Sequence, residues 1–187
     1  MASEYIAPHI TQIDSGRCKH TNCWASVGAY LVDSGTRGRI RPTPMQFRAK
    51  VGALKNCRTG GLGDLIVGCQ KYGVKCVLLE DVSRDSARKR FANKNSKRVY
   101  GVPFDWERWD DAKKCAGDYD GYHMSCVIPG MNKNKAIRTM DPLCSRIKWV
   151  RRNKIVAAAI EYNDEHVGET KGTIDMVYVV VPNTCAK

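Results

Sequence analysis

Three residues far apart in the sequence have the types that thiol-dependent hydrolysis requires, namely Cys23, His123 and Asp141. Cys23 directly precedes residues 24–32, whose small and apolar side chains recur at helical spacing and predict a helix that begins near the cysteine. A helix N-terminus carries partial positive charge and unpaired N–H groups, which favour a thiolate and can donate to an oxyanion. Cys23 is therefore the candidate nucleophile.

His123 opens the short apolar segment 123–128, which predicts a strand. A turn-rich stretch, PGMNKN, separates it from a second strand-like segment at 136–140, so the two segments predict a hairpin. Asp141 follows the second strand and precedes Pro142. Neighbouring strands would bring His123 close to Asp141, so that the carboxylate accepts from one ring nitrogen while the other faces the cysteine.

Each of these residues also has an ordinary structural interpretation. Cys23 is one of nine cysteines and would suit a small buried position, and His123 would suit a hydrogen-bonded core. Asp141 before a proline is a common turn signal. The order of the three residues, together with the helix and hairpin around them, favours the catalytic interpretation.

The elements that must position these residues form an α+β pattern, with helices first and antiparallel strands later. We expect a single domain over residues 1–187, with the helical half packed on the sheet and the site between them. The basic stretch 83–98 predicts an insertion that forms a solvated helix or loop. The remaining predicted elements are helices at 44–54, 61–72, 105–116 and 154–162 and strands at 74–79 and 174–181.

Three motifs resemble those of the papain-like cysteine peptidases, particularly the C39-like branch found in bacterial and bacteriophage proteins. They are Asn22–Ser26 (NCWAS), Gly121–Val127 (GYHMSCV) and Met140–Pro142 (MDP). The resemblance spans roughly residues 5–162 and implies a papain-like fold and a peptidase. In such an enzyme Cys23 would attack an amide, His123 would act as general base and then acid, and Asp141 would orient the imidazole.

The resemblance also implies an upstream glutamine that donates to the oxyanion, and Gln12 is the only glutamine before Cys23. The gap of 11 residues is longer than the spacing typical of the family. Asn22, Ser26 and backbone N–H groups are the alternative donors. The implied substrate is a protein or the stem peptide of peptidoglycan, and the implied setting is a bacteriophage virion or tail. A non-catalytic virion protein on the same scaffold is the alternative.

The net charge of +12, from 31 Lys and Arg against 19 Asp and Glu, predicts attraction to nucleic acid, anionic cell-wall polymer or an acidic protein. Basic runs at 84–98 and 146–154 suit phosphate contacts. Aromatic residues are not interleaved with them as in modules that stack bases, so nucleic acid is not an expected partner.

The spacing C-x-H-x-x-C from Cys18 to Cys23 could join Cys57 or Cys69 in a zinc site of a basic nucleic-acid-binding module. The chain has no second close cysteine pair, so we expect no metal and no cofactor. The N-terminus lacks the features of a signal peptide, and no apolar run is long enough to span a membrane. We therefore expect synthesis in a reducing cytoplasm with most thiols free.

Overall fold

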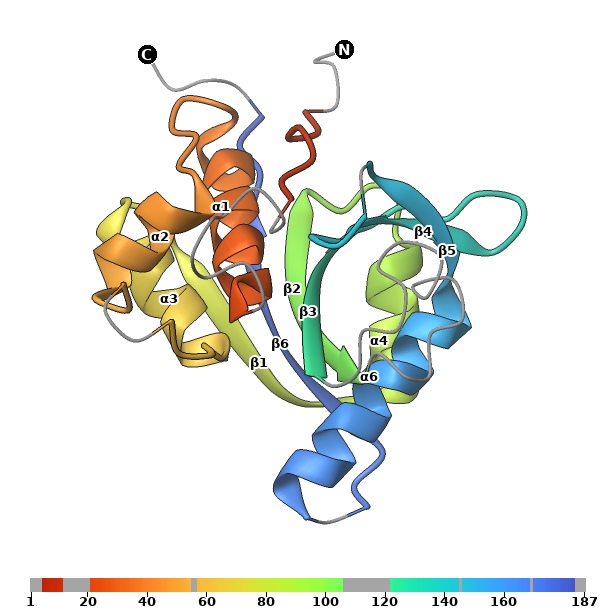
Figure 1. Ribbon diagram of the computed structural model, residues 1–187. Helices are drawn as coiled ribbons and strands as arrows, with labels where there is room; N and C mark the ends of the chain where they lie inside the picture. The colour runs from red at the N-terminus through yellow and green to blue at the C-terminus, as the bar shows by residue number, and fades with distance from the viewer. Residues whose placement is uncertain are drawn as a thin grey trace.

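The computed structural model describes residues 5–11, 21–54, 57–105, 122–144, 146–168 and 170–183 (Figure 1). The helices are α1 (Cys23–Thr36), α2 (Pro44–Val51), α3 (Leu62–Lys71), α4 (Arg84–Ala92) and α6 (Arg152–Val167). The strands are β1 (Cys76–Ser83), β2 (Arg98–Asp105), β3 (Tyr122–Ile128), β4 (Ala136–Met140), β5 (Lys148–Arg151) and β6 (Thr173–Val180).

The six strands form one antiparallel sheet in the order β1-β6-β2-β3-β4-β5. Helices α1 and α3 pack on one face of this sheet with α2 packed against both of them, and α4 and α6 pack on the other face (Figure 1). The architecture is therefore α+β, as the sequence predicts, with the N-terminal helices against an antiparallel sheet. The last strand, β6, lies inside the sheet between β1 and β2.

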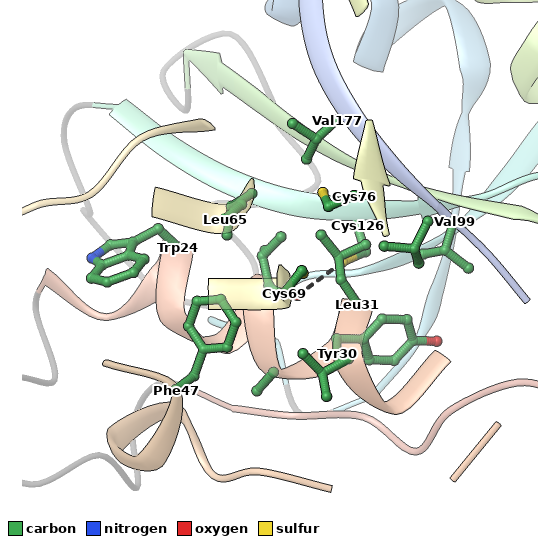
Figure 2. Close-up of a cluster of buried hydrophobic side chains, with 14 of the residues drawn as sticks. Trp24, Tyr30, Leu31, Phe47, Leu65, Cys69, Cys76, Val99, Cys126 and Val177 are labelled. Carbon is green, nitrogen blue, oxygen red and sulfur yellow. Dashed lines mark hydrogen bonds between the residues drawn. The ribbon is translucent and has the colours of Figure 1, made fainter. Parts of the chain in front are cut away.

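Side chains that alternate along the strands build a separate core on each face. The core under α1–α3 includes Trp24 and Phe47, whose rings meet edge to face, together with residues from five strands (Figure 2). Gly101 in β2 allows α1 to approach the sheet closely, since a Cβ there would lie 3.1 Å from side-chain atoms of Val27 and Leu65. This close approach sets the position of α1 over the sheet.

Capping explains where the early helices begin. Thr43 and Gln46 form a capping box at the start of α2, followed by Pro44 at the first helical position, as the sequence predicts. The predicted helices at the sites of α1, α3 and α6 are also present, as are the predicted strands at β1, β3, β4 and β6.

Two strands were not predicted. β2 is buried along nearly its whole length on both faces, so it shows no alternation, and its Gly101 and Pro103 oppose a strand interpretation. β5 has only four residues, Lys148–Arg151. The helix predicted at 105–116 is wrong at its first residue, because Asp105 ends β2, and residues 106–116 lie outside the described residues.

The basic stretch 83–98 contains a helix, α4 (Arg84–Ala92), which is one of the two expected forms, and this helix packs on the core. Its Phe91 is fully buried and meets the Tyr100 ring of β2 at 5.5 Å between centroids. Ala87 is buried on the same side of the helix. The expectation of a merely solvated segment is therefore wrong, because one aromatic and one alanine among many charges are enough to dock a helix of nine residues. None of the helices described here combines the length and apolar character needed to cross a bilayer.

Candidate active site

Cys23 is the first residue of α1 and is partly exposed. The preceding residue, Asn22, makes no capping hydrogen bond with its side chain, and the first turn of the helix contains no acidic residue. The positive end of the helix dipole, where Cys23 lies, is therefore not offset by an acidic side chain within the first turn.

The segment before Cys23 is held by a buried arginine that sequence reasoning missed. Arg48 of α2 is fully buried, and its Nε donates to Oδ1 of Asn22 at 2.8 Å. Its guanidinium also donates to the carbonyls of Thr21 at 2.6 Å, Ala53 at 3.1 Å and Arg58 at 3.0 Å. The signal in the sequence was weak, because a single arginine beside an apolar residue in a short helix usually faces solvent.

Arg48 also acts electrostatically on the site. Burial lowers the pKa of Arg48, followed by repulsion from Arg58, whereas Cys23 acts in the opposite direction. The guanidinium remains a cation at neutral pH because its ordinary pKa is so high. Arg48 is therefore a buried cation that interacts electrostatically with Cys23 at the start of α1.

His123 and Asp141 are in contact. Nε2 of His123 lies 3.1 Å from Oδ1 of Asp141, and both side chains are buried. The pairing of Cys126 with Met140 shows how the hairpin brings them together, since one further step along the strands places Ser125 opposite Asp141. His123 is two residues along β3 from Ser125 and so lies on the same face of the strand.

Asp141 is held at both carboxylate oxygens. Oδ1 accepts from the backbone N–H of Leu143 at 2.9 Å as well as from His123, and Oδ2 accepts from the hydroxyl of Ser125 at 2.5 Å. Ser125 was missed in the sequence, although its place two residues after His123 on an alternating strand is the signal that would have identified it. With these contacts the carboxylate has a fixed orientation toward the imidazole.

The balance of forces on His123 favours the charged imidazolium. Burial lowers its pKa, but the charge and hydrogen bond of Asp141, followed by those of Cys23, outweigh burial and raise the pKa of His123 to about 9. The Cys23 thiol is therefore within interaction distance of the ring. The structure thus brings the three predicted residues together from α1, β3 and the end of β4.

The N-terminal segment, residues 5–11, runs against this site. Nε2 of His9 donates to the backbone carbonyl of Asp141 at 2.8 Å, and Thr11 donates to the carbonyl of Pro142 at 3.1 Å. Tyr5 donates to the buried Asp33 in α1. The segment therefore connects α1 with the turn that carries Asp141.

Of the predicted oxyanion donors, Gln12 lies outside the described residues. Asn22 is engaged elsewhere, since Oδ1 accepts from Arg48 and Nδ2 faces the sulfur of Met45 at 3.7 Å. The Ser26 hydroxyl donates to the carbonyl of Asn22 at 3.0 Å and is buried within α1. Among the alternatives within the described residues, the backbone N–H groups at the start of α1 are the best placed donors.

Comparison with known proteins places this geometry in a known fold. No protein-family model matches the sequence, and no curated protein matches it. Among solved structures, the chain is similar to a Bacillus anthracis protein provisionally assigned as a C39-like peptidase, with a TM-score of 0.59 and 14% identity over 95% of this chain and 96% of that chain. The chain has the fold of a C39-like peptidase. It is also similar, with a TM-score of 0.40 and 9% identity over 96% of this chain and 98% of that chain, to the Pseudomonas avirulence protein AvrPphB. Because this TM-score is low, we draw no conclusion from the second similarity.

In this C39-like peptidase fold, Cys23 differs from the other free cysteines of the described residues. Cys69, Cys76 and Cys126 are buried in the core under α1–α3. Interaction with Cys76 and burial raise the pKa of Cys69, and burial raises that of Cys126, so these two remain neutral thiols. Cys23 alone among the free thiols described is partly exposed.

Cys57 and Cys144 form disulfide bonds. Four of the six cysteines described are free, in agreement with the expectation that most thiols are free, and the two disulfide-bonded cysteines were not predicted. The two cysteines proposed as distant ligands in the alternative zinc site are both engaged in other contacts. Cys57 is in a disulfide, and Cys69 is a free thiol that forms a hydrogen bond with Cys76 inside the core.

A group of carboxylates lies near the start of β3. The ligand oxygens of Asp105, Glu161 and Glu165 are within 4.8 Å of one another, and the hydroxyl of Tyr122 donates to Glu165 at 3.4 Å. Within the part of the chain that the structure describes, no other group of three potential metal ligands lies this close together. Because exposed carboxylates commonly gather without an ion, the group does not identify a metal site.

Proposed function

We propose that the protein is a cysteine peptidase in which Cys23 is the nucleophile, His123 the general base and acid, and Asp141 the residue that orients the imidazole. The observation that carries this proposal is the position of His123, whose ring contacts the Asp141 carboxylate on one side and interacts with the Cys23 thiol. A buried aspartate–histidine pair that reaches a thiol at a helix N-terminus is the arrangement that nucleophilic thiol catalysis needs.

The proposed reaction begins when the Cys23 thiolate attacks the carbonyl carbon of the substrate amide, forming a C–S bond and an oxyanion. Backbone N–H groups in the first turn of α1 stabilise the oxyanion, and Gln12 stays a predicted additional donor. When the tetrahedral intermediate collapses, the C–N bond breaks. The imidazolium of His123 gives its proton to the departing amine, which leaves a thioester on Cys23 and a neutral imidazole.

Hydrolysis of the thioester completes the cycle. His123 takes a proton from a water molecule, and the resulting hydroxide forms a C–O bond with the thioester carbon. Collapse of the second tetrahedral intermediate breaks the C–S bond, releases the carboxylic acid product and restores the thiolate beside the imidazolium. Asp141 stays ionised throughout and stabilises the imidazolium in each half of the cycle.

We infer a peptide substrate, either in a protein or in a peptidoglycan stem peptide, from the family resemblance together with the C39-like fold. Association with a bacteriophage virion stays a prediction. The partly exposed Cys23 supports access by a polypeptide chain, whereas His123 and Asp141 are buried.

The test is selective alkylation followed by peptide mapping. The native protein is treated with iodoacetamide at mildly acidic pH, where an ordinary thiol reacts slowly. We expect label on Cys23 in the wild type and its loss in His123→Ala. His166→Ala is the matched control, because His166 stacks on Tyr162 at 4.0 Å and is exposed. Slow and uniform labelling of several cysteines would overturn the proposal.

A second assay tests hydrolysis itself. Wild type and Cys23→Ser are incubated with a denatured protein substrate and with purified peptidoglycan, and newly formed amino termini are quantified. Cleavage of either substrate by the wild type, absent in Cys23→Ser, supports the proposal and identifies the substrate class. Equal cleavage by both proteins would exclude Cys23 as the nucleophile.

A further inference from the structure

A cavity of about 370 Å³ opens at the end of α1 that is remote from Cys23. A helix of 14 residues is about 20 Å long, so this cavity is distinct from the candidate active site. The cavity lies near the described end of the chain, which is at the top of Figure 1. Its lining includes no acidic residue among those described, and its cations are Arg37, Lys94, Lys97 and Arg98.

The two arginines of the cavity are held in place, and the two lysines are exposed. Arg37 donates to the carbonyls of Pro182 at 2.9 Å and Asn183 at 2.8 Å. The Arg98 guanidinium stands 4.6 Å from the centre of the Tyr178 ring. Lys94 and Lys97 extend from the connection between α4 and β2 into solvent. The cavity therefore combines fixed and mobile positive charges.

A row of contacts leads from this cavity to an exposed tryptophan. Pro129 lines the cavity, and its carbonyl accepts from Nη2 of Arg138 at 3.4 Å. The Arg138 guanidinium in turn stands 5.8 Å from the centre of the Trp149 ring. Trp149 lies on the edge strand β5 and is 53% exposed, whereas Trp24 is buried. We call the surface formed by the four cavity cations, Arg138 and Trp149 the basic track.

The fold gathers this positive charge from three stretches of sequence. Residues 86–104, 121–140 and 142–160 contain fourteen lysines and arginines and no aspartate or glutamate. The backbone N–H of Gly130 donates to the carbonyl of Phe91 at 3.0 Å, and that of Arg152 donates to the carbonyl of Lys135 at 3.1 Å. These bonds hold the three stretches side by side. The fold thus brings Trp149, which lies within the basic run 146–154, close to cations from the other two stretches.

We propose that the basic track binds single-stranded nucleic acid, with phosphates over the cavity cations and a base stacked on Trp149. A phosphodiester chain carries a regular series of negative charges, which matches a surface whose described lining has cations and no acids. An exposed indole offers an unpaired base a stacking surface that depends little on sequence. An acidic polypeptide would use the cations but would leave the indole without a matching group.

The proposal is tested by fluorescence anisotropy with a labelled oligothymidylate of 20 nucleotides. Wild type is compared with Lys94→Glu/Lys97→Glu and with Lys50→Glu/Lys71→Glu, a control that changes the net charge equally at exposed positions on α2 and α3. We expect the track variant to bind about tenfold or more weakly and to lower the salt slope of log affinity by about 1.4, at about 0.7 per phosphate contact. The control should bind nearly as the wild type does.

Trp149 is tested separately. Trp149→Ala should weaken binding by about fivefold or more, and Trp149→Phe, which keeps an aromatic ring, should recover most of the loss. An equal loss in track and control variants would overturn the proposal, and so would unchanged binding by Trp149→Ala. A competition assay, in which unlabelled polymers displace the labelled oligothymidylate from the wild type, tests the same proposal without a variant. Displacement by polyglutamate or by duplex DNA as efficient as by unlabelled oligothymidylate would also exclude a single-strand site.

Discussion

Replacing Asp141 by asparagine keeps an oxygen that accepts from His123 and removes the negative charge. Oδ1 of the aspartate accepts from His123 at 3.1 Å and from the backbone of Leu143 at 2.9 Å, and an asparagine can retain both contacts. Its amide nitrogen would then face the hydroxyl of Ser125, which can accept a hydrogen bond. Asp141→Asn therefore tests charge with little change in geometry.

The magnitude follows from the forces on His123. Burial lowers the pKa, yet the pKa is raised from 6.5 to about 9, so Asp141 and Cys23 together more than offset burial. The net rise corresponds to about 3 kcal/mol. Asp141 raises the pKa more than Cys23 does, and we expect Asp141→Asn to return the pKa of His123 to about 6.5 or below.

The same shift gives the protein a pH-dependent stability with a defined sign. Because the pKa of His123 is higher in the folded than in the unfolded state, its stabilising contribution is fully present below pH 6.5. It is lost as the pH rises from 6.5 through about 9. The wild type should therefore lose about 3 kcal/mol from this residue over that range, and Asp141→Asn should lose little.

Heteronuclear NMR of the histidine rings measures the pKa directly, and His123→Ala assigns the resonance. Titration of wild type, Asp141→Asn and Cys23→Ala separates the contributions of the carboxylate and the thiol. A wild-type His123 that titrates near 6.5, or an Asp141→Asn variant that still titrates near 9, would refute the electrostatic reasoning. The variant should also lose activity about 100-fold at pH 8.5, because its imidazolium would be largely deprotonated there.

Three other outcomes are expected. Ser125→Ala removes a hydroxyl that donates to a buried carboxylate, so urea unfolding should show a loss of about 2 kcal/mol; no loss would mean that water replaces the hydroxyl. Arg48→Met leaves several buried acceptors without a donor, so we expect the free energy of unfolding to fall by about 3 kcal/mol or more. We also expect slower alkylation of Cys23 at pH 6, because Arg48 interacts with Cys23. An alkylation rate equal to that of the wild type would exclude an electrostatic role of Arg48. Mass-spectrometric mapping of unreduced peptides should find Cys57 and Cys144 in disulfides, and both as free thiols would contradict the structure.

The candidate site was largely predictable because each of its residues stands beside a strong local signal. Cys23 precedes a periodic apolar segment, and His123 and Asp141 flank a hairpin with a turn-rich connection. The residues that support them were not predictable in this way. Arg48 is 25 residues from Cys23, and its burial depends on how α2 packs on α1. No local pattern carries that information.

One central strand of the sheet also could not be predicted from its local sequence. β3, β4 and β6 have clear strand patterns, but β2 is covered on both faces and carries a glycine and a proline, so its sequence lacks the alternation that marks a half-buried strand. The basic track was also invisible, because Arg138 and Trp149 meet only through the pairing of β4 with β5. Charge and aromatic character were both in the sequence, whereas their coincidence is a property of the tertiary structure.

β6 comes late in the sequence but lies at an interior position of the sheet. It is the last strand of the chain, yet it is the strand that joins β1 to β2. During synthesis, residues up to 172 can form local helices and hairpins, but the sheet lacks its joining strand until residues 173–180 have been made. Pairings this distant in sequence make folding slow. β6 thus joins β1 to the half of the sheet that carries His123, and residues 173–180 must pair along both of their edges before the sheet is continuous.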